Sequence, residues 1–438
     1  MAMIGATAFA PQRALSMTKL HLKTFSAACV LIRLLVGCSS DPDAPANTTA
    51  PPDGDQDSGS SGVDAGGIDA HVEDDAAADA APDRRIEWDS GGDAGAPVVH
   101  EMWARGNAFC ARVQRPSGTT VECWGNNTSG ELGRGEVTTI LTRGTTFKPF
   151  PIDSPDAPNF RVVRGSSNLG SVMCGVTNDD ELKCWGATYG SSAVRSSVPA
   201  EPLRTGVADV SVGPNHACAL LTDSRVACWG SNTYDGLLGM GTSGGLVQPV
   251  PQVIPNFTAD QVSSGVTTTC AVKDGEVWCW GAGHLTGNGS LFNPVTSPTR
   301  VAGLTGIKKV QAHTYTFALA EDKTLWFWGS GPGSALSYTP MKVPDPTPDD
   351  PNRVMSDVED VAGDCLRFTN GKVRCLSVTG ATYRFNEMPR VSDAVRLEPF
   401  CALSSAGTLR CWGANAAGQL GVPPTLLPSA PASVEVKL

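Results

Sequence analysis

The sequence predicts an all-β protein, a seven-bladed β-propeller that follows an export signal and an acidic tether. Three observations predict this fold: seven repeated units between residues 98 and 438, a pair of cysteines that recurs in six of them, and a composition with 48 Gly and 32 Pro. So much Gly and Pro disfavours long helices. Repeats of about this length that contain several short strands are typical of propeller blades.

The first 38 residues have the features of an export signal. Two lysines precede a short apolar run that contains Arg33 and ends in Leu-Val-Gly-Cys at Cys38. The run is too short to span a bilayer in the ordinary way. Its last four residues resemble the bacterial lipobox, in which cleavage before the cysteine leaves the thiol lipidated. We therefore expect residues 1–38 to be a signal peptide, with Met17 as the more natural start, and Cys38 to carry a lipid; an ordinary secretory signal is the alternative.

Residues 39–97 form the predicted tether. They hold fifteen Asp and Glu against Arg84 and Arg85, with many Ala, Gly, Pro and Ser. Such a segment cannot bury enough apolar surface to offset its ordering entropy, and its like charges repel. We expect a disordered linker. Its aspartates lack the fixed spacing of a calcium loop, so we predict no metal there.

The remaining residues, 98–438, are nearly neutral, with 27 Lys and Arg against 29 Asp and Glu. A nucleic-acid binder needs a basic surface that this balance does not supply. We therefore expect no nucleic-acid partner, and contact with a membrane only through the lipid anchor.

Paired cysteines define the units. Each pair flanks a turn signal such as Asp274-Gly275, and residues placed in this way face each other across a hairpin at a distance that suits a disulfide. The inferred pairs are Cys110 with Cys123, Cys174 with Cys184, Cys218 with Cys228, Cys270 with Cys279, Cys365 with Cys375, and Cys401 with Cys411.

The fifth unit has Phe317 and Phe327 at the two cysteine positions. Joint loss of both cysteines indicates a crosslink, because one cysteine without its partner cannot form a bridge. Free buried thiols and a zinc site are the alternatives, but no Cys-x-x-Cys occurs and the six His keep no fixed offset from the pairs. We expect six disulfides, an oxidising compartment, and neither a metal nor another cofactor.

Three units resemble the repeat of the regulator of chromosome condensation family, whose signature is W-G-x-N-x-x-G-x-L-G and whose fold is a seven-bladed propeller. The resemblance covers residues 98–438. The second, fourth and fifth units keep only the Trp-Gly step, and the sixth lacks it. A kelch or Asp-box propeller is the alternative fold. The signature residues are Trp124, Gly125, Asn126, Gly130, Leu132 and Gly133, then Trp229, Gly230, Asn232, Gly236, Leu238 and Gly239, then Trp412, Gly413, Asn415, Gly418, Leu420 and Gly421.

The two ends of the repeat region predict how the ring closes. The chain enters at Val98 inside a repeat, without the Pro-rich strand that lies before the fourth unit at residues 248–255. Residues 430–438 supply a similar strand at the other end. We therefore expect the N- and C-terminal strands to pair within one blade, since closure removes exposed sheet edges.

Catalytic motifs are missing from the sequence. It has no nucleophile elbow, phosphate loop, HExxH or local carboxylate pair, so we predict no catalytic residue and no enzyme. His216 is expected to be a structural, hydrogen-bonded histidine, and His284 and His313 have no partner at a telling spacing.

Function is then predicted from compartment and fold. We expect a monomeric binding module for a protein or a glycan, anchored to the bacterial envelope at the outer membrane or cell surface. Secreted bacterial relatives of this fold include an inhibitor of β-lactamases. An envelope hydrolase or lyase with a site built from loops is the alternative, and nucleotide exchange on a small GTPase conflicts with export.

Long connections between blades are the candidate binding elements, because loops carry function on rigid scaffolds. The two longest lie at residues 135–160 and 330–353. In the second we select Tyr338, Met341 and Lys342 as candidate contacts; a solvated surface loop without a partner is the alternative.

Overall fold

The computed structural model describes residues 97–436, apart from 134–149, 152–159, 167–170, 190, 204–205, 233–234, 246, 291, 331–335, 346–348, 351, 380–381, 423–426 and 428. The chain divides into two compact units, residues 1–68 and 69–438, and every described residue lies in the second. The predicted signal peptide, Cys38 and the tether up to residue 96 lie outside the described residues. Within the described ranges, no helix has the length and apolar character needed to cross a membrane.

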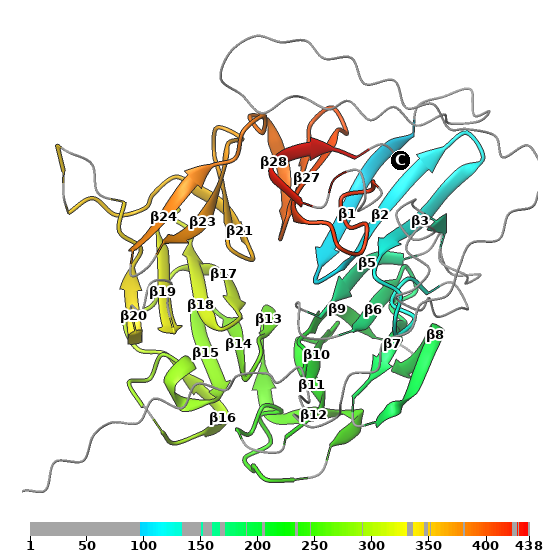
Figure 1. Ribbon diagram of the computed structural model, residues 1–438. Coiled ribbons are helices and arrows are strands. Elements are labelled where there is room, and N and C mark those ends of the chain that lie inside the picture. The colour runs from blue at the N-terminus through cyan, green and yellow to red at the C-terminus, as the bar shows by residue number, and fades with distance from the viewer. Residues whose placement is uncertain are drawn as a thin grey trace, which may run out of the picture. The chain divides into compact units, whose positions relative to one another are not determined.

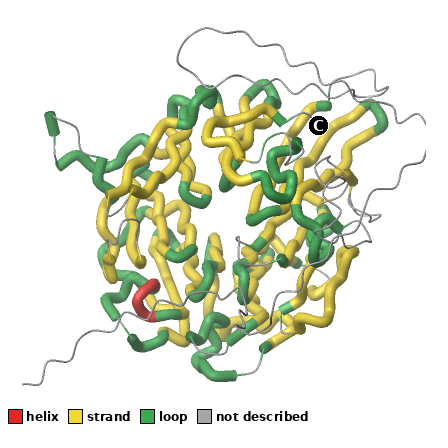
Figure 2. Tube along the Cα trace, viewed as in Figure 1, coloured by secondary structure: helices red, strands yellow, loops and turns green. Residues whose placement is uncertain are grey.

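Seven four-stranded antiparallel sheets surround a ring axis, which confirms the predicted propeller (Figure 1). Each sheet is one blade of consecutive strands, numbered here one to seven in chain order. In Figure 2 the described residues form strands and loops, apart from one short helix, η2 (Gly283–Leu285). The strands are β1 (Val98–Arg105), β2 (Ala108–Arg115), β3 (Gly118–Gly125), β4 (Phe150–Pro151); β5 (Phe160–Gly165), β6 (Val172–Thr177), β7 (Leu182–Thr188), β8 (Ser191–Leu203); β9 (Val207–Val212), β10 (His216–Leu221), β11 (Arg225–Gly230), β12 (Gln248–Thr258); β13 (Gln261–Ser264), β14 (Thr268–Lys273), β15 (Glu276–Gly281), β16 (Val295–Arg300); β17 (Ile307–Ala312), β18 (Tyr315–Ala320), β19 (Leu325–Ser330), β20 (Leu336–Lys342); β21 (Val358–Ala362), β22 (Cys365–Phe368), β23 (Val373–Thr379), β24 (Thr382–Glu387); β25 (Ala394–Glu398), β26 (Cys401–Ser404), β27 (Leu409–Ala414) and β28 (Ser429–Glu435).

The core consists of apolar layers between neighbouring blades. In the layer between blades one and two, for example, Trp103 and Val121 pack with Phe160 and Trp185. Each sheet therefore buries both faces, one against the blade before it and one against the blade after it. This arrangement explains why the central strands are apolar along their whole length, as in β6, where every residue is buried.

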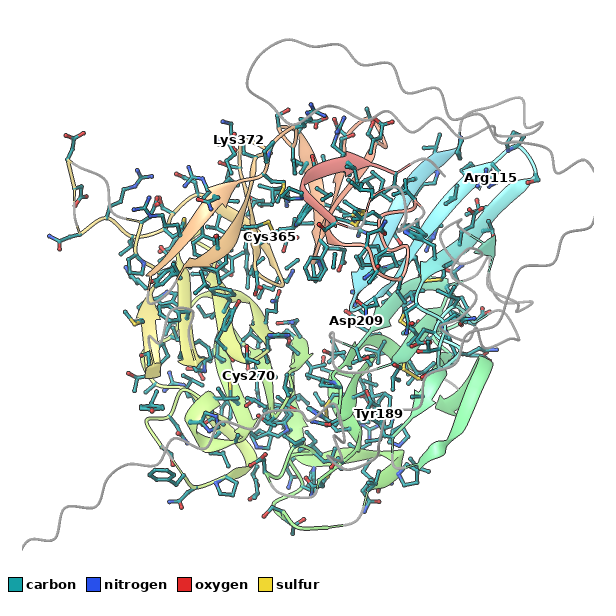
Figure 3. The ribbon with its side chains drawn as sticks, in the orientation of Figure 1. Arg115, Tyr189, Asp209, Cys270, Cys365 and Lys372 are labelled. Atoms are coloured by element: carbon teal, nitrogen blue, oxygen red, sulfur yellow. A yellow bond between two sulfur atoms is a disulfide. The ribbon has the colours of Figure 1, made fainter. Side chains whose placement is uncertain are left out.

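Disulfides join the second and third strands of six blades. The bonded pairs are those that the cysteine spacing predicts, and the paired Cα atoms lie 4.0 to 4.1 Å apart. Figure 3 shows the side chains of Cys270 in blade four and Cys365 in blade six. In blade five, Phe317 lies opposite Phe327 in the same register, and both rings are buried. An aromatic pair thus occupies the position of the bridge in this blade.

The glycine of the Trp-Gly step turns the chain out of the third strand. Gly125 has a φ of +107°, and a Cβ atom there would lie 2.2 Å from the carbonyl oxygen of Asn107. No other residue fits such a position. In blade six Ser377 follows Leu376 at the equivalent step, and it pairs with Arg384 in a continuous β23–β24 hairpin. Loss of the glycine therefore coincides with loss of the turn.

The predicted pairing of the terminal strands is wrong. β28 pairs with β27 in blade seven, where Val434 lies opposite Cys411, and β1 is an end strand of a different sheet. The prediction failed because it placed the Pro-rich strand before each hairpin. In fact this strand follows the hairpin as the outer strand of the same blade, as β12 follows β11.

The ring closes by packing between blade seven and blade one. Met102 and Trp124 of blade one share a buried cluster with Leu403 and Leu420 of blade seven. The side-chain amide of Gln419 also donates to Asn107 Oδ1 at 3.0 Å. Closure therefore uses the same face-to-face contact that joins every other pair of blades.

Candidate functional site

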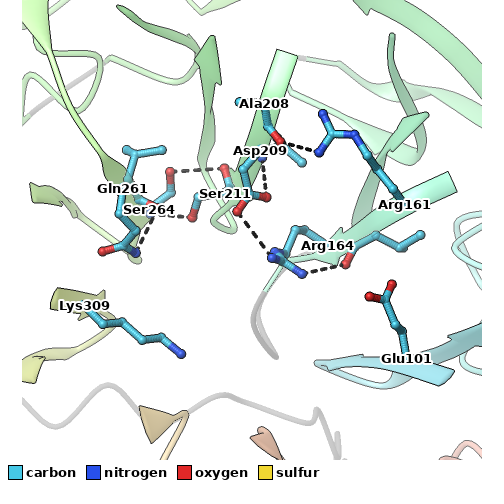
Figure 4. A network of polar contacts seen from close by, with 12 residues as sticks. Glu101, Arg161, Arg164, Ala208, Asp209, Ser211, Gln261, Ser264 and Lys309 are labelled. Carbon is cyan, nitrogen blue, oxygen red and sulfur yellow. Dashed lines mark hydrogen bonds and ion pairs between the residues drawn. The ribbon is translucent and has the colours of Figure 1, made fainter. Parts of the chain in front are cut away.

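Charged and amide side chains on the innermost strands tie neighbouring blades together near the ring axis (Figure 4). Arg164 of blade two approaches Asp209 of blade three at 3.4 Å. Gln261 of blade four binds both backbone groups of Val310 in blade five, at 2.8 and 2.9 Å. Two further ion pairs in this belt join Lys309 to Asp360 at 2.6 Å and Arg396 to Glu101 at 3.4 Å.

These ties occupy the carboxylates that face the axis. Desolvation lowers the pKa of Arg164, but attraction to Asp209 and Glu398 outweighs it and holds the pKa above its ordinary value. The guanidinium therefore stays charged. The belt holds neighbouring blades together, because its charged and amide groups are bonded across the blade junctions.

His216 is a buried histidine between blades three and four. Its ring is fully buried, and Nε2 lies 2.6 Å from Thr269 Oγ1. Burial lowers its pKa from 6.5 to about 3, so the ring is neutral at physiological pH. This environment supports the interpretation of a structural histidine. His284 is half-buried near Asp235, whose pKa is raised by desolvation, and His313 Nδ1 lies 3.2 Å from Thr314 Oγ1.

We expect His216 to make the propeller acid-sensitive. Between pH 6.5 and about 3 the unfolded chain binds a proton at this residue and the folded chain does not, so the free energy of unfolding falls as pH falls, by about 1.4 kcal/mol per pH unit. Urea unfolding at pH 7 and pH 5 should show a loss in the native protein about 2 kcal/mol larger than in His216→Gln. Equal losses in the two proteins would contradict this assignment.

Tryptophan side chains join four of the blades to a loop of the blade before them. In four junctions the indole Nε1 of the third strand donates to a carbonyl oxygen in the preceding blade, at 2.7 to 2.9 Å. The donor and acceptor pairs are Trp124 to Gln419, Trp185 to Glu131, Trp280 to Leu237, and Trp328 to Leu285. In these four junctions the loop that follows one Trp-Gly step therefore caps the tryptophan of the next blade.

An asparagine side chain fixes the shape of this loop. In blades three and seven the backbone N–H of Leu238 and Leu420 donates to Asn232 Oδ1 and Asn415 Oδ1, at 3.2 and 2.8 Å. In blade one Leu132 donates to Asn127 at 3.0 Å, so the signature residue is Asn127 and the sequence assignment to Asn126 is wrong. Two adjacent asparagines made the register ambiguous. These asparagines therefore have a structural role, because they hold the backbone of the loop in place.

Blade six departs from this pattern in two ways. It lacks the Trp-Gly step, and its third and fourth strands form a hairpin whose pairing runs through six consecutive residue pairs. It therefore has no capping loop to offer Trp412 of blade seven. The indole Nε1 of Trp412 is buried and has no hydrogen-bond partner among the described residues, and the side chain is 5% exposed.

The outer strand of blade six is also unusual. Prolines, which cannot donate to an added strand, occur in the outer strands of the other six blades: Pro151 in β4, Pro199 and Pro202 in β8, Pro249, Pro251 and Pro255 in β12, Pro298 in β16, Pro340 in β20, and Pro431 in β28. Natural sheets use proline to block pairing at exposed edges. β24, with the sequence TYRFNE, has none.

The predicted binding residues lie on a strand instead of a loop. Tyr338, Met341 and Lys342 belong to β20, the outer strand of blade five. Met341 is 40% exposed, and Lys342 Nζ lies 5.4 Å from the centre of the Trp326 ring. The prolines of this segment suggested a loop, whereas outer strands tolerate proline.

The first candidate loop also contains part of a blade. Phe150–Pro151 forms β4 and pairs with β3. Most of residues 135–160 lie outside the described residues, so their predicted role as a binding loop stays a prediction. Among the residues that the structure describes, no group of three or more His, Cys, Asp or Glu is placed to hold a metal ion.

Comparison with known proteins identifies one repeat and several relatives. Residues 207–235 match the family model "Regulator of chromosome condensation (RCC1) repeat". The chain is 26% identical over 245 residues to the probable E3 ubiquitin-protein ligase HERC6 of Homo sapiens, covering 55% of this chain and 21% of that protein. It is 27% identical over 266 residues to the mitochondrial RCC1 domain-containing protein RUG3 of Arabidopsis thaliana, covering 50% of this chain and 58% of the relative. The chain thus spans less than two thirds of either relative.

Solved structures share the fold. Prp20p of Saccharomyces cerevisiae superposes with a TM-score of 0.60 at 17% identity, over 73% of this chain and 86% of that one. Yeast RCC1 (Prp20) in a complex with Kap60 gives 0.58 at 16% identity, over 78% and 85%. At this level of identity the likeness concerns the fold. The chain is therefore a propeller that resembles those built from RCC1 repeats.

Proposed function

We propose that this chain is an exported binding module that is anchored to the envelope through Cys38 and binds a protein partner with its propeller. Six disulfides suit an oxidising compartment, and the lipobox-like sequence at residues 35–38 supports the anchor, at the outer membrane or cell surface. The acidic tether would hold the propeller away from the membrane.

The open edge of blade six is the observation that carries the proposal. Met388 N donates to the Val373 carbonyl at 2.8 Å, and positions along an antiparallel pair alternate between facing the partner strand and facing away. The backbone groups of Tyr383, Phe385 and Glu387 therefore point outward. An extended peptide can add to such an edge as a further strand through main-chain hydrogen bonds. A peptide offers these bonds and a glycan does not, so a protein partner is favoured.

Relatives of the same fold support a protein partner. The yeast propeller Prp20p has reported binding properties to Gsp1p and histones, and it has been crystallised with Kap60. We infer only that this scaffold suits protein recognition. The ligase activity in the name of the human relative is not transferred, because the chain covers about a fifth of that protein.

Proline at the open edge is expected to abolish binding. In Glu387→Pro the outward donor is lost and no bond to β23 is broken, since position 387 faces away from that strand. Glu387 also pairs with Lys372 at 2.9 Å, so Glu387→Gln is the matched control that removes this pair and keeps the N–H. Capture of proteins from an envelope extract should be lost in Glu387→Pro and kept in Glu387→Gln.

Two outcomes would contradict the proposal. Equal capture by Glu387→Pro and the native propeller would remove the blade-six edge as the binding element. Cleavage of cell-wall or capsule polysaccharide by the purified propeller would instead favour the alternative function of an envelope hydrolase or lyase.

A further inference from the structure

The junction between blades six and seven lacks the hydrogen bond between a loop carbonyl and an indole N–H that four other junctions contain. Where this bond is present, a loop places a backbone carbonyl against the indole N–H of the following blade. Trp412 occupies the same position on β27, and it packs with Val373 and Met388 of blade six. Its side chain is therefore directed toward the blade that has lost the loop, and its N–H has no acceptor in the part of the chain that the structure describes.

We propose that this junction is a binding site for a turn of a partner protein with the sequence type x-Leu-Gly, whose carbonyl before the leucine accepts the hydrogen bond of Trp412 Nε1. The inference rests on the proposed function only in that the ligand is a protein segment. It concerns a buried indole between two blades, which is a different surface from the outer edge of β24.

The chain itself shows what such an occupant needs. In the three junctions where the acceptor is Gln419, Glu131 or Leu237, the next residue is a leucine that is completely buried. These leucines are Leu420, Leu132 and Leu238. A partner turn must therefore supply both a carbonyl and an apolar side chain.

Glycine follows because the loop passes directly over the indole. A Cβ atom on Gly239 would lie 3.0 Å from Nε1 of Trp280, and one on Gly287 would lie 2.9 Å from Nε1 of Trp328. A side chain at this point would press against the donor that the loop satisfies. The occupant is thus restricted to a turn with glycine two residues after the acceptor carbonyl.

An unpaired buried N–H makes the site selective for a hydrogen-bond acceptor. A buried donor without a partner costs free energy that a correctly placed carbonyl recovers. Because Nε1 of Trp412 is buried in the free protein, the incoming turn must displace the side chains that cover it. Binding that requires such a movement is expected to be slow in association.

Indole signals provide a direct test. The probe is a synthetic peptide with the sequence of residues 413–422, GANAAGQLGV, which is the loop of blade seven itself. In protein labelled with ¹⁵N at the tryptophan indoles, the signal of Trp412 is assigned by its loss in Trp412→Phe. We expect the peptide to move this signal downfield in a saturable manner and to leave the already bonded indoles of Trp280 and Trp328 unchanged. The same peptide with Leu420→Ala and Gly421→Ala should have no effect.

Two variants separate binding from stability. Trp412→Phe and Trp328→Phe each shorten a buried aromatic side chain, so both should lower the melting temperature. Trp412→Phe loses no hydrogen bond to the described residues, so it should melt later than Trp328→Phe, while its peptide dissociation constant rises about tenfold. Trp328→Phe removes a bonded N–H of the same kind, so it should melt earlier and bind the peptide normally. An unmoved Trp412 signal at millimolar peptide, or equal binding by the control peptide, would overturn the proposal. The test needs no envelope partner, so its result is independent of the Glu387→Pro experiment.

Discussion

Reduction of the folded propeller is expected to unfold it at room temperature. Each bridge closes a loop of about ten residues, with sequence separations from 9 to 13, and the chain-entropy model assigns such a loop about 2.5 kcal/mol. Six bridges then contribute about 15 kcal/mol, which equals the upper end of the total stability of ordinary domains. Blade five, which has Phe317 opposite Phe327, shows that one blade can do without a bridge.

Thiol labelling and circular dichroism would test this expectation. The propeller should bind no alkylating reagent before reduction, and mass spectrometry should find each cysteine linked within its own blade. After reduction the β-sheet signal should be lost below 40 °C. A reduced protein that melts within a few degrees of the oxidised one would show that blade packing alone holds the fold. Removal of one bridge, in Cys270→Ala with Cys279→Ala, should lower the free energy of unfolding by about 2 to 3 kcal/mol.

The cysteine pairs show why much of the fold could be predicted. A residue pair symmetric about a turn can only be opposite in a hairpin, so the spacing of Cys270 and Cys279 around Asp274-Gly275 specifies the register of two strands. Repetition of this frame seven times gives the number of blades. Phe317 and Phe327 support the same prediction, because they occupy the two cysteine positions in the same register without a disulfide between them.

Features of the fold that depend on contacts between neighbouring strands and blades could not be predicted from the sequence. Whether the Pro-rich strand belongs to the hairpin before it or to the one after it depends on hydrogen bonds between distant residues. The predicted blade for β28 was wrong for this reason. β20 was missed because its sequence, LSYTPMK, contains a proline that an edge strand tolerates. The candidate site at Trp412 could not be predicted from the sequence. The missing loop in blade six becomes significant only when the hydrogen-bond partners of the tryptophans in the other blades are known. The absence of Trp-Gly after Cys375 was the available signal.

Deletion of residues 429–438 is expected to destabilise the propeller severely, although these residues do not pair with the N-terminal strand β1. β28 places Ala430 and Val436 in the cluster shared by blades seven and one, and Ser433 Oγ donates to the Pro389 carbonyl at 2.6 Å. Its loss would expose β27 as an open edge and uncover the layer that closes the ring. The truncated protein should be insoluble or should melt at least 10 °C earlier.

Two valines of blade seven provide a milder version of the same test. Val436 is 5% exposed and Val395 is 49% exposed. Val436→Ala should lower the free energy of unfolding by about 2 kcal/mol, because it leaves a cavity beside Gly421, whereas Val395→Ala should change it by less than about 0.5 kcal/mol. If both variants and the truncated protein melt like the native chain, the junction between blades seven and one does not depend on β28. Closure must then rest on the other contacts between these blades, such as those of Trp124 and Gln419.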